Sequence, residues 1–210
     1  LLKVLAGVNK PDSGVAHIAG KNAFDLRGKA RRETIGFIPQ EPSDLLYGQS
    51  VKIECQQADR DNELELGTTY GVLQQLVPGI SESTHPRDLS EGQRLGLALS
   101  VVLSSNPSVL ILDEPTRGLD YEAKNELTRI LISFASVFGK AVVLATHDVE
   151  LVAELATRVI FIADGDIVAD GSTLDVLLSS PAFAPQVAKV MSPQPWLSVK
   201  DVVAAIEGMQ

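Results

Sequence analysis

The stretch Val109-Leu110-Ile111-Leu112-Asp113-Glu114 decides the fold of this chain. Its four apolar residues run without interruption, which predicts a buried strand, and the run ends abruptly in two adjacent carboxylates. In open α/β sheets, ligands bind beyond the carboxyl ends of the strands. A carboxylate at that place can hold a hard cation such as Mg²⁺, so we expect Asp113 to be a metal ligand.

The second carboxylate, Glu114, has a different expected task. Side chains alternate along a strand, so Glu114 points away from Asp113 and is free to orient or deprotonate a water that attacks a phosphate. The simpler alternative is a strand that merely exits into a polar loop. The surrounding motifs favour the catalytic interpretation.

The rest of the chain alternates short apolar runs with segments of helical period. This pattern predicts an α/β fold, with a parallel sheet covered by helices. Residues 121–138 carry apolar side chains at spacings of three and four, as an amphipathic crossover helix does. Asp164-Gly165 predicts a tight hairpin between the last two strands. Further strands are predicted at residues 34–38, 141–146, 158–163 and 166–169.

Strand signals disappear in the middle of the chain. Between Glu41 and Ser104 the sequence instead predicts helices, at residues 51–59, 68–77 and 91–104. We therefore expect three parts, the first of which is discontinuous in sequence. They are a core of residues 1–40 and 106–171, an inserted helical subdomain of residues 41–105, and a C-terminal helical tail of residues 172–210.

Composition narrows the class of protein. With 210 residues and 45% hydrophobic composition, the chain can bury the core of one domain or of a domain with a small appendage. A formal net charge of -9 argues against a nucleic-acid partner. No apolar run approaches the roughly 18 residues of a membrane-spanning helix. The single cysteine, Cys55, cannot form an internal disulfide, which favours a reducing compartment such as the cytoplasm.

The pentapeptide Leu89-Ser90-Glu91-Gly92-Gln93 directly precedes an amphipathic helical run. Free backbone N–H groups and the positive end of the helix dipole make such a start a binding site for anions. The Ser90 hydroxyl and the Gly92 amide could then reach phosphate oxygens. The alternative is that Ser90 serves only as the N-cap of this helix.

Two further polar residues follow predicted strands. His147 comes directly after the strand at 141–146, at the same sheet edge as the carboxylates, where an imidazole can hydrogen-bond a terminal phosphate. Gln40 follows the strand at 34–38 through Pro39, and its amide could bridge a metal, a water and a moving loop.

Five elements thus occur in a fixed order: Gln40, residues 89–93, residues 109–114, Gly118-Leu119-Asp120 and His147. They resemble the Q-loop, the signature, the Walker B strand with its catalytic glutamate, the D-loop and the switch histidine of the ATP-binding subunits of ABC transporters. The resemblance extends from the first residue to about residue 171. It implies a P-loop NTPase fold with a RecA-like, three-layer core and an inserted helical subdomain, and it implies ATP and Mg²⁺ as cofactors.

The same resemblance implies roles for individual residues. ATP would lie between the phosphate-binding loop of one domain and Ser90, Gly92 and Gln93 of a second. Asp120 would lie at the seam between the two domains. Asp113 would bind Mg²⁺ with help from Gln40, while Glu114 and His147, together with Gln40, would form the catalytic set.

The resemblance also implies partners. One is a second ABC ATPase domain, which could be identical, paralogous or fused in the same polypeptide. The other is an integral membrane subunit, contacted near residues 42–47, which would put the chain at the cytoplasmic face of the cell membrane. A narrower resemblance, carried by residues 88–94, 114–121 and 177–187, is to the ATPase components of energy-coupling factor importers of vitamins and metal ions.

One motif of the family is absent from this sequence. No G-x-x-x-x-G-K-[ST] loop occurs, although its Lys and Ser/Thr would contact the phosphates and Mg²⁺. Residues 1–7 resemble the helix that follows such a loop, so we expect the loop and the strand that feeds it to lie immediately upstream. We expect residues 1–210 alone to be inactive. Two alternatives stay open: a soluble ABC-type ATPase not linked to transport, and a nucleotide-incompetent half.

A second departure is Glu91, where the commonest signature has glycine. A carboxylate next to a γ-phosphate is strongly repulsive at low dielectric. We therefore expect Glu91 to point into solvent or toward Arg94.

Overall fold

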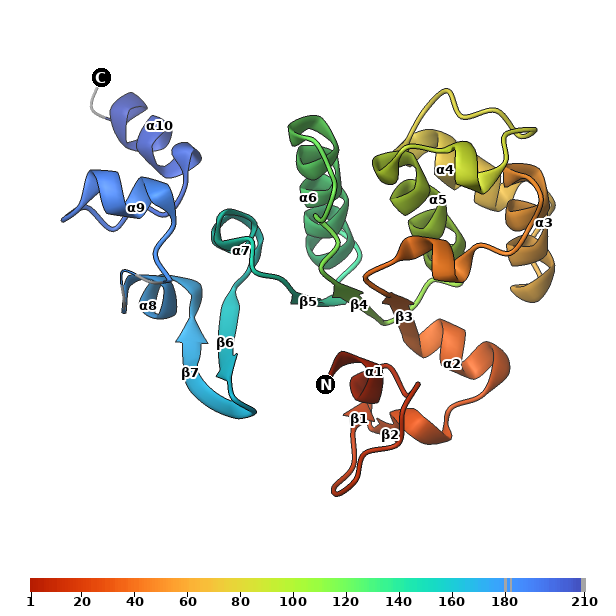
Figure 1. The fold of residues 1–210 in the computed structure, drawn as a ribbon, viewed down its shortest axis with the longest axis horizontal. Helices are drawn as coiled ribbons and strands as arrows, with labels where there is room; N and C mark the ends of the chain where they lie inside the picture. Colours follow the sequence, from red (N-terminus) through yellow and green to blue (C-terminus); the bar gives the residue numbers. More distant parts are fainter. Residues whose placement is uncertain (180, 182, 209–210) are drawn as a thin grey trace. The chain divides into compact units, whose positions relative to one another are not determined.

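The computed structural model describes residues 1–179, 181 and 183–208 (Figure 1). The chain forms two compact units, Leu1–Ala145 and Thr146–Gln210, which are described separately. In the described part of the chain, no helix has the length and apolar character needed to span a bilayer. The expected division into core, helical subdomain and tail stays a prediction.

A three-stranded parallel sheet forms the centre of the first unit. Its strands are β3 (Ile35–Ile38), β4 (Val109–Asp113) and β5 (Ala141–Ala145), hydrogen-bonded in that order. The register pairs Leu112 with Ile38 on one side and with Leu144 on the other. The carboxyl ends of all three strands therefore lie at one edge, as the sequence predicts.

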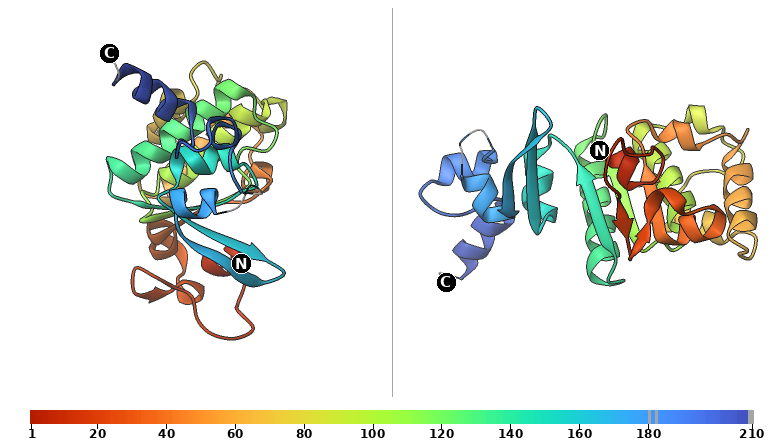
Figure 2. Two further views of the ribbon diagram at one scale, coloured as in Figure 1. Left: turned by 90° about the vertical axis from the view of Figure 1, so that its left-hand side faces the viewer. Right: turned by 90° about the horizontal axis from the view of Figure 1, so that it is seen from below.

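Helices cover both faces of this sheet. Figure 1 has α5 (Glu91–Leu103) and α6 (Tyr121–Ser136) on one side and α1 (Leu2–Leu5) on the other. The right-hand view in Figure 2, seen from below, has α1 in front of the strands. Ile111 packs with Ala6 on the α1 side. Leu110 and Leu112, which alternate with Ile111, are fully buried on the opposite side.

The α1 side of the sheet is completed by short elements. A small hairpin of β1 (His17–Ile18) and β2 (Lys21–Asn22) leads through a 3₁₀ turn, η1 (Ala23–Asp25), to α2 (Gly28–Thr34). Gly7 has φ +67°, and a Cβ there would lie 2.2 Å from the Ala23 carbonyl oxygen. Glycine is thus required directly after the C-cap of α1.

A helical segment follows β3. It contains η2 (Pro42–Leu45), α3 (Val51–Asp61), α4 (Thr68–Leu76), η3 (Pro86–Asp88) and α5. These helices share a hydrophobic cluster that includes Val51, Cys55, Leu73 and Leu97. Burial raises the pKa of the Cys55 thiol to about 12, so this cysteine packs as a neutral apolar group.

One charged residue, Asp59, is fully buried among these helices. Its carboxylate accepts hydrogen bonds from the backbone amide of Gly67 at 2.7 Å, and from the amide and hydroxyl of Thr69 at 2.8 and 2.6 Å. These donors belong to the first turn of α4, whose free N–H groups favour a negative charge. Asp59 therefore fastens the start of α4 to the end of α3.

The second unit consists of an antiparallel hairpin and short helices. Its strands are β6 (Arg158–Ala163) and β7 (Asp166–Ser172), joined by Asp164 and Gly165 with φ of 51° and 88°. These left-handed conformations confirm the predicted tight turn. The helices are α7 (Val149–Leu155), α8 (Thr173–Leu178), α9 (Gln186–Met191) and α10 (Val199–Glu207).

The sequence missed three helices, α2, α7 and α9, which contain six or seven residues each. Two turns give too few apolar positions to define a helical period. The strand predicted at 34–38 begins one residue later, because Thr34 closes α2 with its hydroxyl bonded to the Ala30 carbonyl at 2.7 Å.

We predict that Asp59→Ala lowers the free energy of unfolding by about 3 kcal/mol, because it leaves the buried amide and hydroxyl of Thr69 without their acceptor. The matched control is Asp61→Ala, two residues along the same helix and exposed, for which we expect a change within about 0.5 kcal/mol. Urea unfolding followed by circular dichroism measures both. Equal effects of the two substitutions would contradict the role given to Asp59.

Candidate functional site

The turn after β4 has an unusual backbone. Glu114 has φ +49°, a left-handed conformation that costs a non-glycine residue on the order of 1 kcal/mol or more. Its amide donates a hydrogen bond to the Ala145 carbonyl at 2.8 Å, which ties the ends of β4 and β5 together. Strain of this kind concentrates at functional sites. Asp113 and Glu114 are both half-buried.

A pocket of about 230 Å³ lies beside Glu114. Gln40, from the segment after β3, lines the same pocket, as do Glu41, Glu91 and Arg117. Residues that are distant in sequence thus meet at one place, and two of the predicted catalytic residues, Gln40 and Glu114, are among them.

Two ion pairs organise the charges of this pocket. Arg117 Nη1 lies 3.2 Å from Glu41 Oε1, with both side chains more than half exposed, so water screens the attraction. Arg94 Nη1 lies 2.8 Å from Glu91 Oε1. The expectation that Glu91 turns toward Arg94 is therefore confirmed.

Ser90 is the N-cap of α5. Its hydroxyl oxygen accepts the Gln93 amide at 3.3 Å, and the Gln93 side chain in turn accepts the Ser90 amide at 3.0 Å, forming a capping box. The structural role proposed as the alternative for Ser90 is thus present. In this cap the Ser90 hydroxyl oxygen is an acceptor, so the cap does not use the hydroxyl hydrogen. Because Ser90 is exposed, that hydrogen can still be donated to a ligand.

Arg94 has a positioning role that was not predicted from the sequence. Its guanidinium fixes the segment before Ser90. It donates to the Leu89 carbonyl at 2.8 Å while it binds Glu91, and its side chain is only 17% exposed. The sequence signal for this role was an arginine in the first turn of a largely apolar helix. A guanidinium that is nearly buried there needs several hydrogen-bond acceptors nearby.

Gly92 and Asp120 join the start of α5 to the start of α6. A Cβ at Gly92 would lie 3.1 Å from the Cβ of Ala123, so glycine permits the two helices to approach. Asp120 caps α6 by accepting the Ala123 amide at 2.8 Å. The nucleotide-binding roles predicted for Gly92, Gln93 and Asp120 stay predictions beside these structural ones.

His147 belongs to the second unit, where it is exposed. It follows Ala145, the last residue of β5, by two positions. Asp148, next to it, caps α7 by accepting the Leu151 amide at 3.2 Å. The contact of His147 with a terminal phosphate stays a prediction.

Asp113 is the residue that could hold a metal. The described residues contain no group of three or more His, Cys, Asp or Glu side chains placed to bind an ion. Mg²⁺ in nucleotide sites uses only one or two protein carboxylates, and phosphate oxygens and waters supply the other ligands. A half-buried carboxylate at the end of β4 fits that pattern.

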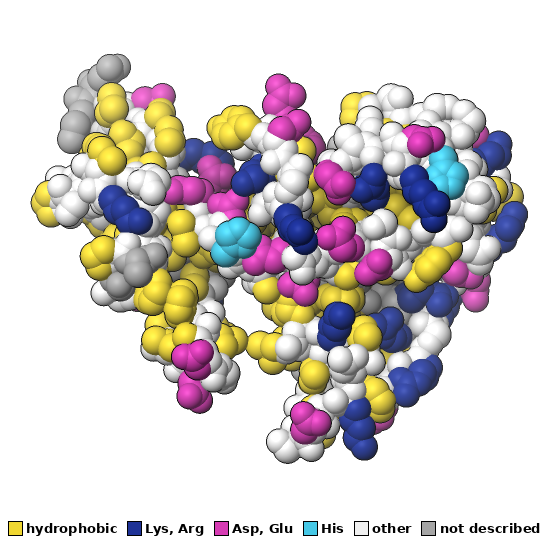
Figure 3. Space-filling view, in the orientation of Figure 1, with side chains coloured by type: hydrophobic (Ala, Val, Ile, Leu, Met, Phe, Trp, Pro, Cys, Tyr) yellow, Lys and Arg dark blue, Asp and Glu magenta, His cyan; other side chains and the backbone are white. Residues whose placement is uncertain are grey.

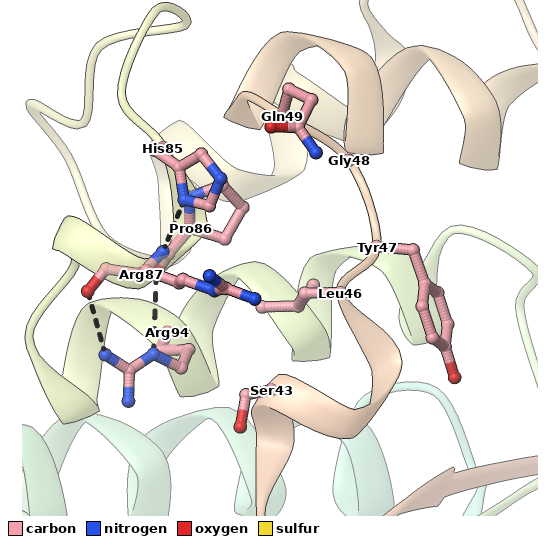
Figure 4. Close-up of a pocket in the computed structure, with 9 residues that line it drawn as sticks. All are labelled: Ser43, Leu46, Tyr47, Gly48, Gln49, His85, Pro86, Arg87 and Arg94. Carbon is pink, nitrogen blue, oxygen red and sulfur yellow. Dashed lines mark hydrogen bonds between the residues drawn. The ribbon is translucent and has the colours of Figure 1, made fainter.

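A second pocket, of about 470 Å³, opens between η2 and η3. We call it the groove, and it is lined by Ser43, Leu46, Tyr47, His85, Arg87 and neighbouring residues. Figure 4 shows the Arg87 side chain extending toward Leu46, with Tyr47 at the rim. Tyr47 is 83% exposed, an unusual position for a large aromatic ring.

The family model described as ABC transporter matches residues 1–117, more than half of the chain. The chain belongs to the ABC transporter family. The ABC ATP-binding domain is thus identified by the segment that contains β3, β4 and the signature pentapeptide, and the expected α/β, P-loop NTPase fold is confirmed by its structural neighbours.

Some relatives of this ABC domain are named only as ABC transporter ATP-binding proteins, and others as energy-coupling factor ATP-binding proteins. A Streptomyces coelicolor protein, named as an ABC transporter ATP-binding protein, is 50% identical over 206 residues, which is 98% of this chain but 36% of that protein. The chain spans about a third of that relative. An energy-coupling factor transporter ATP-binding protein of Methanospirillum hungatei is 32% identical over 84% of this chain and 65% of its own length.

Solved structures share the fold of the ABC domain. The cbiO1 protein of Clostridium perfringens, described as part of the cbiONQ transporter complex, is 26% identical with a TM-score of 0.69, over 91% of this chain and 78% of that one. An ATP-binding cassette solved as a dimer with ADP and phosphate gives a TM-score of 0.72 at 22% identity, over 82% of this chain and 78% of its own.

We predict that Ser90→Ala lowers the free energy of unfolding by about 1 kcal/mol, because the first turn of α5 loses its cap. Ser90→Asn, which can accept the same amide, should stay within a few tenths of a kcal/mol of the parent. Thermal or urea unfolding of the three proteins tests this. Equal losses for Ala and Asn would show that the hydroxyl does not act as a cap.

Proposed function

We propose that this chain is the ATP-hydrolysing part of a subunit that powers import through a membrane ABC transporter of the energy-coupling factor type. The observation that carries the proposal is the pocket shared by Gln40 and Glu114 at the carboxyl end of a buried strand, in a member of the ABC family. Relatives that are named as energy-coupling factor transporter ATP-binding proteins support the narrower assignment.

The chemistry follows from where the side chains lie. Glu114 accepts a proton from, or orients, the water that attacks the γ-phosphate. Gln40, which lines the same pocket, hydrogen-bonds that water or the phosphate and transmits the presence of the phosphate to the helical segment that follows. Asp113 would hold Mg²⁺, which supplies neutralisation of phosphate charge when bound. Catalysis is then positioning plus electrostatics.

A second ATPase domain completes the site in this proposal. Ser90 and Gly92 would face the nucleotide held by the phosphate-binding loop of the other domain. His147 would contact the γ-phosphate of the nucleotide bound by its own domain. A relative solved as a dimer supports this arrangement.

The phosphate-binding loop itself would come from residues outside the present sequence. The central strand β4 is buried, whereas Val142, Val143 and Leu144 of β5 stay only half-buried although they are apolar. Within the part of the chain that the structure describes, β5 pairs with β4 alone. A further strand along the free edge of β5, leading into the loop, would bury these side chains.

The groove is the proposed contact with the membrane subunit. It combines an exposed aromatic ring at Tyr47 with the cationic side chain of Arg87 and the polar Ser43, so it suits an amphipathic segment of another protein. It includes the 42–47 segment directly after Gln40, through which the state of the nucleotide pocket would be transmitted. The chain would thereby act at the cytoplasmic face of the membrane.

We predict that Glu114→Gln in the full-length protein retains ATP affinity and lowers turnover at least about a hundredfold, because an amide of the same shape cannot accept the proton. Glu122→Gln, an exposed neighbour in the first turn of α6, should leave both quantities unchanged. Nucleotide binding by fluorescence and phosphate release measure the two effects. Unchanged turnover would remove Glu114 from the role of base.

We predict that Tyr47→Ala reduces co-purification of the full-length protein with its integral membrane subunit severalfold, without changing ATP affinity. Phe138→Ala is the control, because Phe138 is also an exposed aromatic residue, at 65%, but lies beyond the end of α6. Quantitative pull-down from solubilised membranes measures the effect. If the unmodified protein recovers no integral membrane subunit, the transport assignment is wrong and a soluble ATPase takes its place.

A further inference from the structure

Charge is distributed unevenly along this acidic chain. Residues 1–32 contain seven of the 18 Lys+Arg residues but only two of the 27 Asp+Glu residues, which gives this segment a net charge of about +5 while the remainder carries about -14. The seven cations are Lys3, Lys10, Lys21, Arg27, Lys29, Arg31 and Arg32. We refer to them together as the basic face.

The basic face is contiguous in the first unit. Lys3 lies in α1, Lys10 in the loop after it and Lys21 in β2, while the other four cations lie in α2 or at its N-cap. The Arg31 guanidinium joins α2 to the end of α1 by donating to the Ala6 carbonyl at 2.9 Å. Figure 3 shows Lys and Arg side chains gathered over the region that Figure 1 labels β2 and α2. Five of the seven cations, all but Arg31 and Arg32, are exposed.

The arginines are fixed by neutral groups. Arg27 donates to the carbonyls of Phe24 and Leu26, and Arg32 donates to the Asn62 side-chain oxygen at 3.0 Å and to the Asp61 carbonyl. A carbonyl orients a guanidinium without cancelling its charge. The structure therefore holds these cations in place while their positive field reaches the solvent.

Neighbouring cations of the basic face repel one another. Burial, together with the positive charge of Arg27, lowers the pKa of Arg31. Lys29 also pairs with Glu63 at 2.6 Å. An anionic ligand laid over the surface would be favourable because it offsets this repulsion.

Apolar side chains accompany the cations. Val8 and Val15, on either side of Lys10, are 47% and 65% exposed. Cations with small exposed apolar groups between them are typical of surfaces that bind the headgroup region of a bilayer. Single-stranded nucleic acid would instead require exposed aromatic rings for base stacking, and the one aromatic residue of this segment, Phe24, is half-buried beneath Arg27.

We propose that the basic face docks on the anionic headgroups of a membrane. The inference rests on the proposed function, which brings the chain to the cytoplasmic leaflet, where anionic lipids give a negative surface potential. It adds a direct contact with lipid to the contact with a membrane subunit. The lipid contact would raise the local concentration of the ATPase at the membrane and orient it there.

The test measures binding of the full chain to sedimenting vesicles. Vesicles of phosphatidylcholine alone are compared with vesicles in which about a third of the lipid is phosphatidylserine. We expect binding only to the latter, weakening steeply as salt is raised. The combined variant Lys3→Gln, Lys10→Gln, Lys21→Gln should bind at least about tenfold more weakly, since each cation near an anionic surface contributes about fivefold.

A matched control removes the same number of charges elsewhere. Lys52→Gln, Lys140→Gln, Lys189→Gln lies outside the basic face and should bind like the parent, with unfolding curves recorded for both variants. Three results would overturn the proposal: equal binding to both vesicle types, equal weakening in the two variants, or tighter binding to a short RNA or DNA than to anionic vesicles at the same salt.

The assay contains no ATP and no membrane protein, so its outcome is separate from that of the proposed ATPase. Vesicle binding by an otherwise inactive Glu114→Gln variant would support the basic face alone. If the protein hydrolyses ATP but does not bind anionic vesicles, the proposed lipid contact is wrong and the proposed catalytic site is unaffected.

Discussion

The burial of β4 on both faces is the constraint on which the rest of the structure depends. Leu110, Ile111 and Leu112 are fully buried, and each neighbour strand lies parallel to β4 in register. A shift by one residue would exchange the side chains between the two layers of helices. Asp113 and Glu114 are consequently held at the sheet edge, where the apolar layers end and polar side chains can meet a ligand.

The turn after β4 adds a second constraint to the first. The left-handed backbone of Glu114 would be costly in isolation, but its amide bond to the Ala145 carbonyl secures the turn against β5. The direction of the Glu114 side chain is therefore set by the backbone of two strands. In the proposed mechanism, this turn would hold Glu114 in position as a general base before substrate arrives.

Sequence patterns predicted those parts of the fold that local chemistry determines. The apolar run of β4 ends at the expected residue, Asp113. The helix predicted at 121–138 begins at the expected residue and ends two residues early, at Ser136, and the structure adds Asp120 as its cap. Helix α2 was missed because it is charged along most of its length. It is held by contacts distant in sequence, such as that of Arg31 with the Ala6 carbonyl, and no local pattern contains them.

The candidate site likewise has features that the sequence predicts and features that only the structure shows. The edge position of Glu114 and Gln40 follows from the rule that ligands bind at the carboxyl ends of parallel strands. The presence of Glu91 and Arg117 in the same pocket follows from how α5 and the 115–119 turn pack, which only the structure gives. Ser90 was correctly expected at a helix start, and the structure adds that its hydroxyl oxygen already serves the cap.

Arg94 explains how a carboxylate is tolerated at the start of α5. Its guanidinium binds the Leu89 carbonyl and Glu91 together, so the extra negative charge is compensated within one helical turn. The positive end of the helix dipole, the Ser90 hydroxyl hydrogen and the Gly92 amide remain as groups that attract an anion. An acidic residue in the signature is thus compatible with phosphate binding because the arginine that fixes the loop also draws the carboxylate aside.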